Sequence, residues 1–280
     1  MKKVLVVGAN STLAQEVIPV LAKNNTIITA GKEKCDVTID ITKDIELPES
    51  IDILINFAAA LGGKSDDAIL ENVRTNVLGV LNLCAAAKKD GIKHIVQISS
   101  IYTLSPIDSP GYSIYSLTKR QADELAEFYC RKNDINLTIL RPSQVYGDSN
   151  AFAKNQPFFY QMIDSAQKGE DIKIFGDHDP LRNYLHINDL AEVIGRVVNT
   201  GLGGTYACMY PSDVSFSQVA QAAQKTFGAH GSVIFLKNRP AIEDSVFPKD
   251  LEIYQKLNYQ PQISVDSGIA RIKDYREAHR

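Results

Sequence analysis

The chain has 280 residues, with 30 Lys and Arg against 33 Asp and Glu, a formal net charge of −3, and 44% hydrophobic residues. A chain of this length and composition can bury a sizeable core without disulfides or metal ions, in one large domain or two ordinary ones. Its near-neutral charge argues against nucleic-acid binding, and no apolar run approaches the roughly 18 residues of a membrane span. Four cysteines without CxxC spacing predict reduced thiols in a cytoplasmic protein.

The first half of the chain alternates short apolar runs with longer amphipathic segments. Apolar runs without internal alternation, separated by helices, predict a doubly wound parallel α/β sheet of the Rossmann-like kind, covered on both faces. Ligands of such a sheet bind at the carboxyl ends of its strands. The sequence predicts strands at 4–7, 26–30, 51–57, 95–98 and 137–140, and helices at 13–21, 67–89 and 115–132.

The second half is less regular. Prolines at 211, 240, 248 and 261 divide its last part into short elements. We expect a dinucleotide-binding domain over residues 1–147, with 184–200 packing back onto it, and a smaller, interrupted substrate-binding domain over 148–280. The pattern predicts helices at 158–168, 188–199 and 217–227, and a strand at 172–175.

The first strand leads through a small-residue turn into a helix. Gly8, Ser11 and Ala14 fall at spacings of three, where larger side chains would block a pyrophosphate or separate the helix from the strand. Gly8 is the one glycine of the three, so an ordinary turn capped by Ser11 stays an alternative. The segment from Gly8 to Leu13, with Asn10, Ser11 and Thr12, is the predicted phosphate-binding turn.

The second strand ends in Gly31 and Lys32, without a carboxylate at the strand end to repel a 2′-phosphate. Lys32 would attract that phosphate, so NADP(H) is favoured and NAD(H) remains possible. Lys32 as a plain surface lysine is the alternative.

Tyr115 and Lys119 are four residues apart and share one face of a predicted helix. The lysine ammonium should lower the pKa of the tyrosine, which then serves as a general acid or base. Ser100 directly follows a predicted strand and can hold a carbonyl oxygen or a sugar hydroxyl. These three residues are the predicted catalytic group. The histidines show no metal-binding spacing, so no metal site is predicted.

With these motifs the chain resembles the extended short-chain dehydrogenase/reductases of the NAD-dependent epimerase/dehydratase type, which modify nucleotide sugars. The resemblance implies that Ser100, Tyr115 and Lys119 are catalytic and that Tyr115 and Lys119 also contact the cofactor. Further cofactor contacts implied by the resemblance are Asp40, Ile41, Ala58, Ala59, Ala60, Asn76 and Pro142.

The resemblance also implies the substrate contacts and the assembly. Arg182 lies in the most specific segment, Arg182–Ala191, and its planar donor fork suits a diphosphate. Ser100, Gln144 and Arg239 are the other implied substrate contacts. The alternatives are a structural role for Arg182 and a surface position for Arg239. A homodimer through the two long central helices is implied, with a nucleotide sugar as the small-molecule partner and no membrane.

Ile101 and Tyr102 stand where dehydratases of the family carry an acidic pair, so dehydration is not expected. The shortened segment between Gly31 and Ile51 resembles the reductase branch. The leading prediction is reduction of a 4-keto sugar, with Tyr115 donating the proton. It rests on the NADP-like pair Gly31 and Lys32, because a reductase must exchange its cofactor while an epimerase usually retains it. C4 epimerisation with retained NAD is the alternative. A non-catalytic dinucleotide sensor is a remoter one, as is a P-loop NTPase using the loosened pattern Ala58–Ser65.

Overall fold

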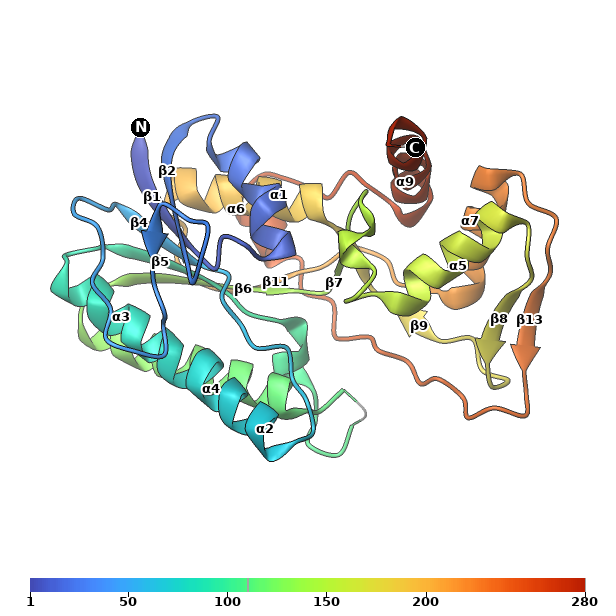
Figure 1. Ribbon diagram of the computed structural model, residues 1–280, viewed down its shortest axis with the longest axis horizontal. Coiled ribbons are helices and arrows are strands. Elements are labelled where there is room, and N and C mark those ends of the chain that lie inside the picture. The colour runs from blue at the N-terminus through green and yellow to red at the C-terminus, as the bar shows by residue number, and fades with distance from the viewer. Residues whose placement is uncertain (110, 280) are drawn as a thin grey trace. The chain divides into compact units, whose positions relative to one another are not determined.

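The computed structural model describes residues 1–109 and 111–279 and contains a seven-stranded parallel sheet (Figure 1). Its strand order is β11-β6-β5-β4-β1-β2-β3, and the reversal of order beside β1 confirms the predicted doubly wound architecture. β1, β4 and β5 are almost completely buried, as the unbroken apolar runs predict. The strands are β1 (Lys2–Val7), β2 (Asn25–Gly31), β3 (Val37–Thr38), β4 (Ile53–Asn56), β5 (His94–Ile98), β6 (Asn136–Pro142) and β11 (Gly204–Cys208).

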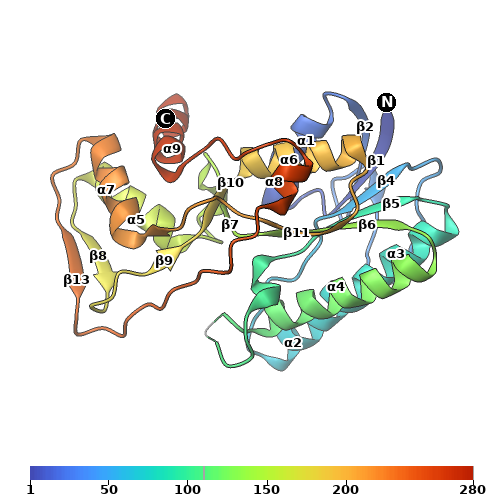
Figure 2. The ribbon, with the colours of Figure 1, turned by 180° about the vertical axis from the view of Figure 1, so that it is seen from behind.

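Helices cover both faces of this sheet. Figures 1 and 2 show α1 and α6 on one face and α2, α3 and α4 on the other. The crossover between β2 and β4 contains no helix among the described residues. It consists of β3 and irregular backbone, in agreement with the short segment seen in the sequence. The helices are α1 (Thr12–Leu21), α2 (Asp66–Asn72), η1 (Val73–Leu78), α3 (Gly79–Lys89), η2 (Ile101–Leu104), α4 (Ile114–Lys132) and α6 (Ile187–Thr200).

The predicted helix at 67–89 is a continuous helical segment with a π-helical turn, η1, between α2 and α3. A π-turn is rare and is found mostly at functional sites. It places Asn72 and Asn76 in the buried interior, where both side chains make hydrogen bonds.

The backbone contacts divide the chain into two compact units. The first unit comprises residues 1–142, 191–208 and 252–258 and contains the parallel sheet. The second unit comprises residues 143–190, 209–251 and the chain from Tyr259 onward. Among the helices of the described ranges, none is both long and apolar enough to cross a membrane.

The second unit contains short strand pairs and its own helices. β8 pairs with β13 in parallel, β7 with β10 in parallel, and β9 with β12 antiparallel. The elements are β7 (Gln144–Tyr146), η3 (Asn150–Phe152), α5 (Pro157–Lys168), β8 (Ile172–Phe175), β9 (Leu181–Arg182), β10 (Tyr184–His186), β12 (Val214–Ser215), α7 (Phe216–Phe227), β13 (Val233–Leu236) and α9 (Val265–Ala278), while α8 (Glu252–Lys256) belongs mainly to the first unit.

A buried histidine joins neighbouring strands of the main sheet. His94 begins β5, is 6% exposed, and its Nε2 lies 2.8 Å from Oγ1 of Thr138 on β6. Because the Thr138 hydroxyl donates to the carbonyl of Leu202, Nε2 carries the proton of a neutral ring. Burial, with a contribution from Lys2, lowers the pKa of His94 to about 4 from the usual 6.5.

This pKa predicts a loss of stability in acid. The unfolded chain binds the His94 proton more tightly between pH 6.5 and 4, so this contribution is fully present above pH 6.5 and disappears as the pH falls through about 4. The difference corresponds to about 3 kcal/mol. We expect the free energy of unfolding of His94→Gln, measured with urea across this range, to fall less steeply than that of the wild type. Parallel slopes would contradict the assignment.

Candidate functional site

A cavity of about 360 Å³ lies in the first unit at the carboxyl ends of β1, β2 and β4. Eight of the predicted cofactor residues line it: Gly8, Asn10, Ser11, Lys32, Ile41, Ala58, Ala59 and Ala60. The other lining residues are Val7, Gly31, Glu33, Ile39, Thr42, Phe57, Glu71 and Thr75. The other predicted cofactor contacts are not among the lining residues: Thr12, Leu13, Asp40, Asn76, Tyr115, Lys119 and Pro142.

The turn after β1 is shaped so that backbone can approach a ligand. Gly8 has φ +74°, and a Cβ placed on it would lie 2.5 Å from the backbone nitrogen of Ala58. Ser11 caps α1 by accepting a hydrogen bond from the Ala14 amide at 3.3 Å. The first turn of α1, all of which the structure describes, has no acidic side chain that would repel an anion. The free backbone amides at this helix end can donate hydrogen bonds to a phosphate. The turn therefore fits a dinucleotide pyrophosphate.

The loop after β4 is held from behind by an asparagine on the π-turn. Asn76 Oδ1 accepts from the Ala60 amide at 2.8 Å, and its Nδ2 donates to the Ala60 carbonyl at 3.0 Å and to Thr118 Oγ1 at 3.0 Å. Asn72 accepts from the Gly62 amide at 3.1 Å. Asn76 is thus buried behind the cavity wall, where it fixes the loop and α4 together.

The rim of the cavity carries charges of both signs. Lys32 and Glu33 both line the cavity, and the Lys32 ammonium lies 4.0 Å from a carboxylate oxygen of Asp40. A hydrogen bond from Thr42 lowers the pKa of Asp40, so this group is charged at neutral pH. The positive charge that favours a 2′-phosphate therefore has two acidic neighbours. Glu33 follows Lys32 directly, and sequence reasoning that stopped at the strand end missed it.

Ser100, Tyr115 and Lys119 lie together at the carboxyl end of β5. Ser113 caps α4 with a reciprocal pair of hydrogen bonds, which fixes the start of the helix two residues before Tyr115. Ser100 accepts from the Tyr102 amide at 3.3 Å, and its side chain is hydrogen-bonded to Tyr115. Lys119, 2% exposed, donates from Nζ to the Ile98 carbonyl at 2.6 Å.

The electrostatics of Tyr115 differ from the expectation. Burial raises the pKa of Tyr115, Asp123 and Tyr102 raise it further, and the hydrogen bond from Ser100 lowers it. Lys119 was expected to lower the pKa of Tyr115 below its usual value, and this expectation is wrong, because burial outweighs the hydrogen bond from Ser100 and Lys119 is not among the groups that shift this pKa. Burial also lowers the pKa of Lys119 to about 8, against the opposing effect of Asp123.

The predicted substrate residues Gln144, Arg182 and Arg239 belong to the second unit. Arg182 donates from Nη1 to the carbonyls of Leu181 and Glu243, and its guanidinium lies 5.0 Å from the ring centre of Phe216. Arg239 is exposed in the chain that follows β13, and Gln144 begins β7.

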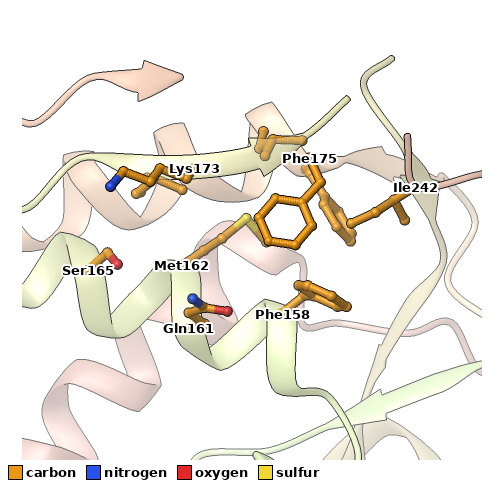
Figure 3. Close-up of a pocket in the computed structure, with 10 residues that line it drawn as sticks. Phe158, Gln161, Met162, Ser165, Lys173, Phe175 and Ile242 are labelled. Atoms are coloured by element: carbon orange, nitrogen blue, oxygen red, sulfur yellow. The ribbon is translucent and has the colours of Figure 1, made fainter. Parts of the chain in front are cut away.

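Phe216, the ring next to the Arg182 guanidinium, also lines a small pocket between α5 and β8 (Figure 3). Its free volume is about 20 Å³, and Met162 forms part of its wall. Phe158 and Phe175 keep 43% and 40% of their surface exposed, so they offer aromatic faces at the pocket mouth.

Comparisons with known proteins relate most of the chain to one family and one fold. The family model described as NAD dependent epimerase/dehydratase family matches residues 4–207. A UDP-glucuronate 4-epimerase of Thermodesulfobacterium geofontis is 28% identical over 260 residues, 83% of this chain and 76% of the relative. A dTDP-glucose 4,6-dehydratase of Streptomyces griseus is 25% identical over 227 residues, 74% of this chain and 66% of the relative. The crystal structure of a Bacillus cereus UDP-glucuronic acid 4-epimerase with UDP-glucuronic acid and NAD is similar in fold (TM-score 0.76, 19% identity, 99% of this chain and 100% of that one).

The crowded backbone at Gly8 predicts a loss of dinucleotide binding in Gly8→Ala. The added methyl group would clash with the backbone of Ala58, and the alanine would have to keep the left-handed backbone of Gly8. We therefore expect the affinity for NADH to fall at least roughly tenfold and the free energy of unfolding to fall by about 2–4 kcal/mol. Gly91→Ala is the matched control, because Gly91 has φ +75° and no atom within 4 Å of an added Cβ. NADH affinity is measured by fluorescence titration and stability by thermal unfolding. Equal NADH affinities in Gly8→Ala and Gly91→Ala would contradict the assignment of the Gly8 turn to the dinucleotide.

Proposed function

Since this chain belongs to the NAD dependent epimerase/dehydratase family, we propose that it oxidises and re-reduces C4 of a nucleotide-activated sugar and so epimerises that carbon. The observation that carries the proposal is that Ser100, Tyr115 and Lys119 lie together at the carboxyl end of β5. The same unit contains a cavity that fits a dinucleotide. This group can hold a sugar hydroxyl and move its proton.

The cofactor we propose is NAD(H), held by the Gly8 turn, Lys32, Glu33 and the loop Ala58–Ala60. When bound, it accepts a hydride from the sugar and returns it, and the positive charge of its oxidised ring favours the tyrosinate form of Tyr115. Glu33 supplies a carboxylate for a ribose diol, and the B. cereus structure that shares this fold contains NAD.

Tyr115 acts as the general base and then the general acid. In the oxidative half it takes the proton of the C4 hydroxyl, while Ser100 holds the oxygen by a hydrogen bond. In the reductive half Tyr115 returns the proton to the same oxygen, and the keto sugar would have turned so that the hydride comes back to the opposite face of C4. Because both the hydride and the proton removed in the first half would be returned in the second, the sugar undergoes no net oxidation and C4 is inverted. The ammonium of Lys119 would donate to the nicotinamide ribose when the cofactor is bound.

Reduction of a 4-keto sugar remains the second candidate, and one specific observation favours it. Lys32 lines the cavity and is exposed, so it can reach a 2′-phosphate of NADPH. Asp40 and Glu33 reduce that attraction, and for this reason we place epimerisation first. Mass spectrometry of the purified protein separates the two candidates, because an epimerase retains NAD through each cycle and a reductase must exchange its cofactor.

We propose that the nucleotide part of the substrate binds the second unit. Arg182 uses one nitrogen for backbone carbonyls, which leaves Nε and Nη2 to donate to a diphosphate. Phe158 and Phe175 present aromatic faces on which a base can stack. The B. cereus and T. geofontis proteins are both named for UDP-activated sugars, and a uridine diphosphate is therefore the nucleotide that we test first.

The homodimer that the sequence resemblance implies stays a prediction. On α4, Leu125 and Phe128 are 37% and 64% exposed, and Leu78 at the start of α3 is 50% exposed. A second copy packed against these helices would cover such side chains.

Removal of the Tyr115 hydroxyl should nearly abolish turnover. We expect Tyr115→Phe to lower kcat by about 10²–10⁴-fold, the usual contribution of a general acid or base, with NADH affinity changed little. The assay is conversion of UDP-glucose, UDP-glucuronic acid, UDP-N-acetylglucosamine and dTDP-glucose, followed by chromatography of the products. A loss below threefold would remove Tyr115 from the chemistry.

Arg182→Ala should act on substrate binding. A charge-assisted contact with a diphosphate contributes roughly 1.5–3 kcal/mol, so KM for the nucleotide sugar should rise by about 10–150-fold with a smaller change in kcat. Arg239→Ala, at an exposed position, gives a second measurement of the same kind. If Arg182→Ala lowers only the thermal stability, the arginine serves the backbone of Leu181 and Glu243 alone.

A further inference from the structure

Asp123 is a buried carboxylate on the same helix face as the catalytic residues. Tyr115, Lys119 and Asp123 follow one another at intervals of four residues along α4, so they form one row. Asp123 is 1% exposed. It does not line the cofactor cavity, and the chemistry proposed above gives it no role.

One oxygen of this carboxylate joins three elements of the site. Oδ2 accepts from Ser99 Oγ at 2.9 Å and from Arg141 Nε at 3.0 Å. Ser99 follows the last residue of β5 and immediately precedes Ser100, and Arg141 lies on β6. Asp123 therefore links α4, the helix that carries Tyr115 and Lys119, by a hydrogen bond to Ser99, the residue before Ser100.

The other oxygen, Oδ1, is buried and has no hydrogen-bond partner among the described residues. Burial raises the pKa of Asp123, while Arg141, the hydrogen bond from Ser99 and Lys119 lower it. Arg141 Nε at 3.0 Å supports the carboxylate form, and that charge raises the pKa of Lys119 against the effect of burial. Asp123 lies on the same helix as Lys119, and Arg141 from β6 pairs with Asp123. Asp123 is thus the negative charge that accompanies the buried ammonium.

We propose that Asp123 is a positioning residue for the reaction, whose carboxylate holds Ser99, and with it the adjacent Ser100, against the helix that carries Tyr115 and Lys119. Its significance for turnover rests on the proposed function; its effect on Lys119 does not. Stability alone is a poor reason for this arrangement, because a buried ion pair costs desolvation that apolar residues of the same volume avoid. An unpaired buried oxygen adds to that cost.

Asp123→Asn tests the charge with little change of shape. We expect kcat to fall roughly tenfold or more at pH 7, with KM for the nucleotide sugar changed less than about twofold, because misplaced groups slow the chemistry rather than the binding. The loss should be at least about threefold larger at pH 8.5 than at pH 6.5, since Lys119 without its counter-charge gives up its proton at lower pH. The control is Glu124→Gln, which removes a negative charge from the exposed residue next to Asp123. It should leave kcat unchanged at both pH 6.5 and pH 8.5.

A second measurement needs no substrate. In protein labelled with ¹³C-lysine, the Cε signal of Lys119, assigned with Lys119→Arg, should titrate at lower pH in Asp123→Asn than in wild type or Glu124→Gln. An unchanged midpoint would overturn the role of the charge, whether or not any sugar is turned over. If no nucleotide sugar is converted but the midpoint moves, the proposed function fails and the link between Asp123 and Lys119 stands.

Two further variants separate position from charge and serve where Asp123→Asn does not fold. Ser99→Ala removes one hydrogen bond and Asp123→Glu lengthens the arm, while both keep the carboxylate. We expect each to leave the Lys119 titration unchanged and to lower kcat several-fold. Wild-type kcat in both folded variants would overturn the positioning role.

Discussion

The burial of one ammonium group against the end of β5 is the constraint on which the site depends. Lys119 Nζ is removed from water, and a charge there is tolerated only with close acceptors and a compensating charge. The Ile98 carbonyl at 2.6 Å supplies the first, and Asp123 supplies the second. Because that carbonyl ends β5, the lysine is fixed to a completely buried strand in the interior of the sheet.

Several surrounding features follow from this constraint. The capping box at Ser113 sets where α4 begins, so the rows along the helix bring Tyr115 and Lys119 toward the strand end. Asn76, on the π-turn, contacts Thr118 on the same helix and the Ala60 loop of the cofactor cavity. A displacement of α4 would therefore disturb both the proton-transfer group and the wall of the dinucleotide cavity.

Most of the sheet unit could be predicted, because its strands are unbroken apolar runs and its helices have clear periodicity. The predicted strand at 95–98 and helix at 115–132 differ from β5 and α4 by one residue at one end. β3 is two residues long and pairs with only the end of β2, so no local pattern marks it. The π-turn within the 67–89 helix was missed too, because it preserves the apolar spacing and changes only the backbone hydrogen bonding.

The candidate site was predictable where a motif has fixed spacing. Tyr115, Lys119 and Ser100 were found in this way, as was the Gly8 turn. Glu33 escaped because its effect depends on where a loop folds, and the direction of the pKa shift of Tyr115 depends on burial that a sequence does not show. Asp123 had a signal, its four-residue step beyond Lys119, but the contacts to Ser99 and Arg141 that give it meaning are tertiary.

The most direct measurement of the central claim is rapid mixing of NAD⁺-loaded protein with a nucleotide sugar while absorbance at 340 nm is recorded. The account predicts a transient reduced nicotinamide signal in the wild type, its absence in Tyr115→Phe, and return of the signal to baseline as the C4 epimer forms. An equal transient in both proteins, or epimer formed without NAD, would contradict the assignment of Ser100, Tyr115 and Lys119 as the reacting group.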